Sequence, residues 1–155
     1  MKIGIIVHSQ TGNTLSVAQK LKEKLSSAGH TASIEQIKAV DEKQTDPKKM
    51  QIQKMPDISS YDALILGAPV HAFSASPVMK VYLSQLPSIQ GKKVACFVTK
   101  MLPFKWTGGT GAVSHMKKSC ESKGGSVVAA GVINWKSGSR EKDIADLVEK
   151  FSKAF

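Results

Sequence analysis

Apolar positions along the chain fall into near-continuous or alternating runs that are separated by runs with helical spacing. The near-continuous or alternating runs occupy residues 2–8, 31–37, 62–68, 92–99 and 126–134. Such runs are typical of parallel strands that are covered on both faces of a sheet. Residues 31–37 keep one polar face, so we expect this strand at an edge of the sheet.

Between these runs, apolar residues recur every three or four positions, as in amphipathic helices. The first helix is expected from Thr14 to Gly29, where glycine suits a left-handed C-terminal cap. Ser76, which precedes a proline, forms a favourable N-cap for the second helix. Two more helices are expected, over residues 111–123 and after the capping residue Ser139.

Strands that alternate with helices predict right-handed crossovers and a parallel sheet covered on both sides. Residues 38–60 are polar and rich in lysine, and we expect at most one short helix there. The pattern contains no repeat and no linker, so residues 1–155 are expected to form a single domain. The predicted fold class is an α/β three-layer sandwich with a five-stranded sheet.

Composition excludes several classes of protein. With 155 residues, 41% hydrophobic and 22% charged, the chain is an ordinary globular protein rather than a disordered one. Its longest apolar run, 127–133, is too short to span a bilayer, and the short run after Lys2 is not a secretory signal. We therefore expect a cytoplasmic protein with no membrane insertion. Cys96 and Cys120 suit core positions, and no Cys/His spacing suits zinc.

Charge points to the kind of partner. Lysine and arginine outnumber acidic residues by 22 to 12, which gives a formal net charge of +10. Such a charge favours a nucleotide, an acidic protein, a nucleic acid or a membrane surface. The lysines are spread along the chain without the interleaved aromatic residues of a nucleic-acid binder, so we expect no nucleic acid partner.

The loop after the first predicted strand has the composition of an anion site. It places three hydroxyls and one glycine before a helix, in the order Ser9, Gln10, Thr11, Gly12, Asn13 and Thr14. In open parallel sheets, ligands bind beyond the carboxyl ends of the strands, and free N–H groups at a helix N-terminus bind anions. The loop lacks the lysine of nucleoside triphosphate sites, so it indicates a terminal phosphate monoester.

The SQTGNT sequence of this loop resembles the phosphate loop of the flavodoxin family, (S/T)xTGxT. The order of elements resembles the short-chain members of that family over the whole chain. The resemblance implies a flavodoxin-like five-stranded parallel sheet with strand order 2-1-3-4-5 and FMN as the cofactor. The hydroxyls of Ser9, Thr11 and Thr14, with the amides from Gln10 to Thr14, would hold the FMN phosphate.

The loops after the third and fourth strands would then flank the flavin. The candidate cofactor-binding residues there are Pro69, Val70, His71, Ala72, Phe73, Thr99, Lys100, Met101, Leu102, Pro103, Phe104, Trp106, Gly108 and Gly109. A flat apolar ring needs aromatic or aliphatic faces, which Phe73, Phe104 or Trp106 would offer. No catalytic side chain and no metal ligand is expected, since the flavin would supply the chemistry.

The charges near these loops differ from those of the family. No acidic residue lies between Asp62 and Glu121, whereas the resemblance implies a flavin surrounded by acids. Lys100, Lys105 and a protonated His71 would instead stabilise the reduced, anionic flavin, each by on the order of 1 kcal/mol at close range. His8, beside the phosphate loop, is expected to pack or to bond to the backbone.

Three functions remain open on the sequence. The favoured one is an FMN-binding electron carrier whose basic flavin rim docks an acidic redox protein. The alternative is an FMN-dependent NAD(P)H oxidoreductase that reduces a quinone or a related acceptor. The third is a flavin-free binding module for an anionic partner. For each of them a monomer or weak dimer is expected.

Overall fold

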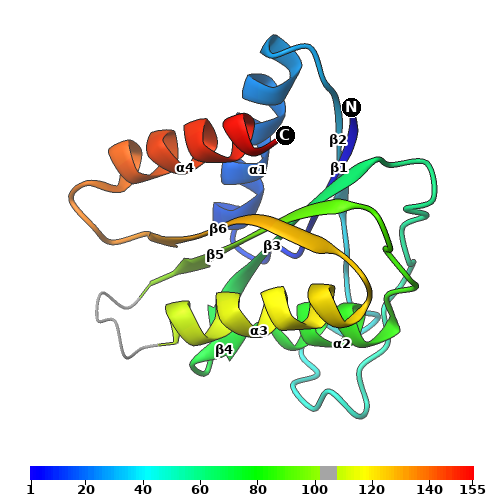
Figure 1. Cartoon of the computed structure of the whole chain (residues 1–155). Helices are drawn as coiled ribbons and strands as arrows, with labels where there is room; N and C mark the ends of the chain where they lie inside the picture. The colour runs from blue at the N-terminus through cyan, green and yellow to red at the C-terminus, as the bar shows by residue number, and fades with distance from the viewer. Residues whose placement is uncertain (102–107) are drawn as a thin grey trace.

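The structure is a computed structural model, and it describes residues 1–101 and 108–155. A twisted parallel sheet lies between two layers of helices (Figure 1). The strands are β1 (Lys2–Val7), β2 (Thr31–Gln36), β3 (Ala63–His71), β4 (Ser74–Ala75), β5 (Lys93–Lys100) and β6 (Ser126–Asn134). The helices are α1 (Asn13–Ser27), α2 (Pro77–Gln85), α3 (Gly109–Ser122) and α4 (Arg140–Ala154).

The main sheet has the strand order β2-β1-β3-β5-β6, and all of these strands are parallel. The order 2-1-3-4-5 and the three-layer α/β fold class are therefore confirmed, with β2 at an edge as expected. The additional strand, β4, is short and pairs with the end of β3 in antiparallel fashion. The order of strands reverses between β1 and β3, so the loops after these strands face each other at the switch point.

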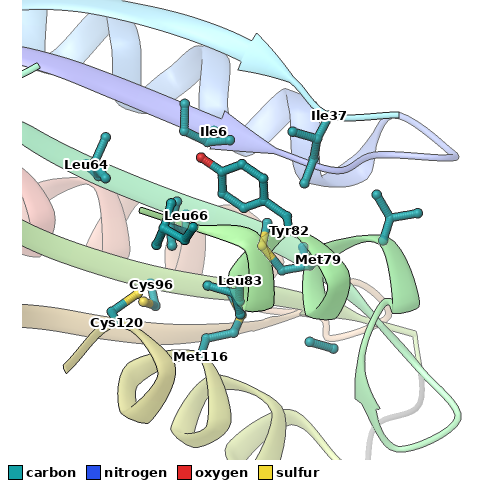
Figure 2. Packing of buried hydrophobic residues seen from close by; sticks show 14 of the residues in the cluster. Ile6, Ile37, Leu64, Leu66, Met79, Tyr82, Leu83, Cys96, Met116 and Cys120 are labelled. Carbon is teal, nitrogen blue, oxygen red and sulfur yellow. The ribbon is translucent and has the colours of Figure 1, made fainter. Parts of the chain in front are cut away.

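Two apolar layers hold the helices against the sheet. On one face, α2 and α3 pack against side chains such as Leu64 and Leu66 (Figure 2). On the other face, α1 and α4 pack against side chains such as Ile5 and Phe97. Gly67 allows the Phe97 ring to lie against the backbone of β3, because a Cβ there would be 2.3 Å from the ring. Cys96 and Cys120 are buried as expected and lie side by side in the first layer (Figure 2).

The polar segment 38–62 covers part of the sheet without forming a helix. Its buried residues Ala39, Met50 and Ile58 belong to the same apolar layer as α2. An isolated antiparallel bridge joins Ala39 to Ile52. The segment therefore takes the place of a covering helix next to α2.

Several predicted element ends are corrected by the structure. Ser139 occupies the N-cap position of α4, but its side chain makes no cap bond and donates instead to Asp143 at 3.0 Å. α3 begins two residues earlier than expected, at Gly109. β3 runs on to His71 because its end forms a hairpin with β4. The Ser76 cap is confirmed, since its hydroxyl accepts the N–H of Met79 at 3.3 Å.

Candidate functional site

The loop 9–14 leads directly from β1 into α1. Gly12 is the N-cap residue with φ 92°, a left-handed conformation that suits glycine. In the first turn of α1, the N–H of Leu15 donates to the Ser9 hydroxyl and the N–H of Ser16 donates to the Gly12 carbonyl. Within the described part of the chain, the N–H groups of residues 10–14 have no acceptor. Consecutive unpaired N–H groups at a helix N-terminus favour a bound anion.

A small cavity of about 90 Å³ opens beside these N–H groups. It is lined by Gln10, Thr11, Asn13, Thr14, Pro69, Val70, His71, Thr99, Lys100 and Met101. All of these residues were predicted as cofactor contacts, and they come from the three loops expected to meet. The cavity is smaller than the roughly 300 Å³ that whole ligands of this class need, so it suits the phosphate end of a ligand.

Two side-chain contacts fix the loop against the end of β5. The Thr14 and Thr99 hydroxyls are hydrogen-bonded at 2.9 Å and buried. The side-chain amide of Asn13 donates to the Met101 sulfur at 3.6 Å. These contacts hold the loop in place without using its backbone N–H groups.

The β3–β4 hairpin forms the second wall of the cavity. His71 pairs with Ser74, which leaves a two-residue turn of Ala72 and Phe73, and both have positive φ, 47° and 67°. This is the pattern of a type I′ turn, which Asn and Gly normally form. Phe73 is 59% exposed at the tip. Gly108 packs against this tip, because a Cβ on Gly108 would lie 2.3 Å from the Phe73 carbonyl oxygen.

The remaining predicted site residues lie outside the cavity wall. Ser9, Gly12, Ala72, Phe73, Gly108 and Gly109 do not line it. Leu102, Pro103, Phe104 and Trp106, with Lys105, lie outside the described residues. Gly108 and Gly109 start α3 in close contact with Phe73 and Lys100, and this packing explains both glycines without a second phosphate.

The structure places Lys100 in the cavity wall, as predicted, and corrects the expected charge of His71. Lys100 lines the cavity, is only 8% exposed and packs against Gly109. Burial lowers the pKa of His71, and the nearby Glu42 carboxylate only partly opposes this effect. His71 is therefore a neutral imidazole near pH 7 rather than the expected cation.

Beside the cavity, His8 is almost fully buried, at 1% exposure. Its Nδ1 lies 2.8 Å from the Ser76 hydroxyl and its Nε2 lies 3.4 Å from Glu42. The His71 ring stands at right angles to it, with centroids 6.4 Å apart. His8 thus packs as expected, but its ring bonds to side chains rather than to the backbone. No pattern in the sequence indicates Glu42, which lies 34 residues from His8 in the polar segment.

The series Ser76, His8 and Glu42 has the residue types of a hydrolase triad, but its geometry does not. Ser76 is fully buried, and its hydroxyl already caps α2. The hydroxyl also faces Nδ1, whereas Nε2 activates the nucleophile in serine hydrolases. Among the described residues, no group of three His, Cys, Asp or Glu side chains is placed to hold a metal ion. The group is therefore a support for the neighbouring loops.

A family model for the flavodoxin domain matches residues 4–134, and the chain belongs to this family. No curated protein matches the sequence.

Many solved structures share the fold, and the three that follow are examples. Oxidised Flavodoxin 2 from Bacillus cereus has a TM-score of 0.73 at 18% identity, covering 100% of both chains. A flavodoxin from Streptococcus pneumonia TIGR4 has a TM-score of 0.73 at 18% identity, covering 99% of this chain and 97% of that one. A flavoprotein in complex with FMN from Lactobacillus acidophilus NCFM has a TM-score of 0.64 at 19% identity, covering 94% and 97%.

Proposed function

We propose that this member of the flavodoxin family is an FMN-binding electron-transfer protein. The observation that carries the proposal is the row of unpaired N–H groups at residues 10–14, in a loop that lines a cavity together with the other two predicted loops. A phosphate monoester is the terminal group of FMN, and helix N-terminal N–H groups stabilise such an anion. The Lactobacillus acidophilus flavoprotein of the same fold is described in complex with FMN.

The chain's own residues would bind and orient the cofactor. The N–H groups of residues 10–14 would hold the phosphate, with the Thr11 hydroxyl beside them. Val70, His71 and Met101 would contact the remainder of the molecule where it leaves the cavity. When bound, FMN supplies reversible one- and two-electron transfer, so the protein needs no catalytic side chain.

The distribution of ion pairs supports an acidic redox protein as partner. Among the described residues, all ion pairs of Lys and Arg side chains lie on α1 and α4. By contrast, Lys80, Lys117 and Lys118 on α2 and α3 have no acidic partner there. The layer formed by α2 and α3 carries these three lysines and one acidic residue, Glu121, so its net charge is positive, and such a field attracts an acidic protein.

We favour an electron carrier over an NAD(P)H oxidoreductase. The glycine-rich start of α3 would have been the second phosphate site, but its glycines are accounted for by packing. No described helix is long and apolar enough to cross a membrane. A cytoplasmic location and a monomer or weak dimer belong to the same proposal.

Reconstitution tests this proposal and separates it from the oxidoreductase. The purified protein is incubated with FMN, desalted, and then mixed with NADH or NADPH without oxygen. We expect about one flavin retained per chain and no rapid loss of the flavin absorbance on adding either nucleotide. Rapid bleaching by NADH or NADPH would identify the oxidoreductase, and loss of all flavin on desalting would count against FMN as the cofactor.

A further inference from the structure

His8 connects the candidate cofactor site to two other segments. It is the residue between β1 and the loop 9–14, and its N–H donates to the Gly67 carbonyl of β3 at 3.1 Å. Its ring contacts the N-cap of α2 through Ser76 and the segment 38–62 through Glu42. A change at this ring therefore reaches the phosphate loop, the hairpin that follows Gly67, and α2.

The hydrogen bonds around His8 assign its protonation state. The Glu42 carboxylate only accepts, so Nε2 carries the hydrogen. The Ser76 hydroxyl already accepts the Met79 N–H, and it can donate its own hydrogen to Nδ1. These roles satisfy every group when His8 is the neutral tautomer with hydrogen on Nε2.

Protonation of Nδ1 breaks this arrangement. The Ser76 hydroxyl would then face a donor, and it would have to turn its own hydrogen elsewhere inside a fully buried cap. Within the described residues, that hydroxyl has no other acceptor. An unpaired buried donor is costly, so the contact between His8 and α2 weakens when the ring is charged.

The proton can reach His8 from solvent through a second pocket. This pocket, of about 370 Å³, is lined by residues that include His8, Glu42 and Val78. It shares Gln10 and His71 with the 90 Å³ cavity beside the loop 9–14. The titratable groups facing His8 are Glu42, which favours the charged ring, and His71, which opposes it. Burial acts in the same direction as His71 and outweighs Glu42, so the pKa of His8 is lowered.

We propose that His8 is a positioning residue that makes the cofactor site sensitive to protons. The neutral ring holds the phosphate loop, the hairpin and α2 in the arrangement that binds FMN, and protonation weakens FMN binding. The inference rests on the proposed function for its ligand, but its geometry is that of the protein alone.

The protonation state of His8 is measured first, without FMN. Nitrogen-15 NMR of the histidine rings distinguishes the two neutral tautomers and the charged form, and the His8→Gln spectrum assigns the His8 signals. We expect hydrogen on Nε2 alone at pH 7.5 and conversion to the charged ring only below pH 6.5. A charged ring at pH 7.5, or hydrogen on Nδ1, would overturn the inference.

The pH dependence of FMN binding is measured second, between pH 7.5 and 5, for the wild type and His8→Gln. Glutamine keeps a donor and an acceptor but does not titrate, and both proteins share the titrations of the FMN phosphate and His71. Each Kd is expressed relative to its value at pH 7.5. We expect the wild-type Kd to rise up to tenfold more per pH unit than that of His8→Gln once His8 protonates.

Coincident pH profiles for the two proteins would overturn the inference while leaving FMN binding intact. If His8→Gln does not fold, Glu42→Gln replaces it in a His71→Gln background, because removing the carboxylate lowers the pKa of both histidines and only His8 then remains to titrate beside it. An unchanged profile in that variant would equally overturn the inference. No FMN binding at pH 7.5 in any protein would refute the proposed function, and the NMR result would still decide the state of His8.

Discussion

At the scale of single residues, Tyr61 and Tyr82 are two largely buried tyrosines with different hydrogen-bonding. The Tyr61 hydroxyl donates to Glu35 at 2.8 Å. The Tyr82 hydroxyl is fully buried and has no partner among the described residues (Figure 2). Burial raises the pKa of Tyr82 far above its ordinary value, so its ring stays neutral.

This difference predicts opposite effects of the same substitution. Tyr82→Phe removes an unpaired buried hydroxyl, so we expect the free energy of unfolding to stay the same or to rise by about 1 kcal/mol. Tyr61→Phe removes a hydrogen bond, and we expect a loss of about 1 kcal/mol. Urea unfolding of both variants measures this, and a larger loss for Tyr82→Phe than for Tyr61→Phe would contradict the assignment.

The turn at the tip of the β3–β4 hairpin stores backbone strain. Ala72 has φ 47°, a conformation that costs an L-residue roughly 1–2 kcal/mol, while glycine adopts it freely. We expect Ala72→Gly to raise the free energy of unfolding by about 0.5 kcal/mol, after the extra entropy of the unfolded chain is counted. Ala28→Gly is the matched control, because Ala28 has an ordinary φ of −86° and should lose stability. A loss in both variants would mean that the turn is not strained.

At the scale of elements, the N-termini of α2 and α4 show how far a local motif predicts structure. Both helices have serine at the N-cap position. Only Ser76 has the extended backbone, with ψ 147°, that directs its hydroxyl toward the first turn. Ser139 has ψ 16°, and its hydroxyl bonds to the Asp143 side chain instead. The residue type was predictable, whereas the backbone angle depends on how the preceding loop packs.

The two serines provide a matched pair of variants. Ser76→Ala removes the cap and the hydroxyl that faces His8, so we expect the free energy of unfolding to fall by at least about 1 kcal/mol. Ser139→Ala removes no cap bond, so the free energy of unfolding should change by less than about 0.5 kcal/mol. Thermal or urea unfolding tests the pair, and equal effects would show that Ser76 does not act as a cap.

The strands, the helices and the cavity lining were predictable because they depend on local patterns. The loop 9–14 lies directly between a strand and a helix in the sequence, so its place in the fold follows from local patterns alone. The contacts of His8 were not predictable, since they join residues 34 and 68 positions apart. The same holds for Lys100, whose burial depends on the packing of α3 against the sheet.

At the scale of the whole molecule, the two buried imidazoles link folding to pH. Burial lowers the pKa of His8 and of His71 from the ordinary value of 6.5. The unfolded chain therefore binds more protons than the folded one between 6.5 and the lowered values, so stability is complete above that window and falls as pH drops through it. The pKa values of three carboxyl groups are also lowered, those of Asp57, Glu141 and Glu149. Their contribution to the free energy of unfolding is lost only at more acidic pH.

We accordingly expect the free energy of unfolding to decrease as the pH falls from 7 to 5, and the decrease to be smaller in His8→Gln. Urea unfolding at a series of pH values measures the slope directly. His30→Gln is the control, because His30 is partly exposed and, within the described residues, its ring is hydrogen-bonded to the chain N-terminus alone. A slope in His8→Gln equal to that of the wild type would show that His8 does not titrate in this range.

The proposed function requires that the unpaired N–H groups of residues 10–14 bind the phosphate of FMN. Titration of the purified protein with FMN and, separately, with riboflavin tests it most directly, since the two flavins differ only in the phosphate. Quenching of flavin fluorescence gives both dissociation constants at pH 7.5. We expect tight binding of FMN and much weaker binding of riboflavin. Equal affinity for the two flavins, or binding of neither, would contradict it.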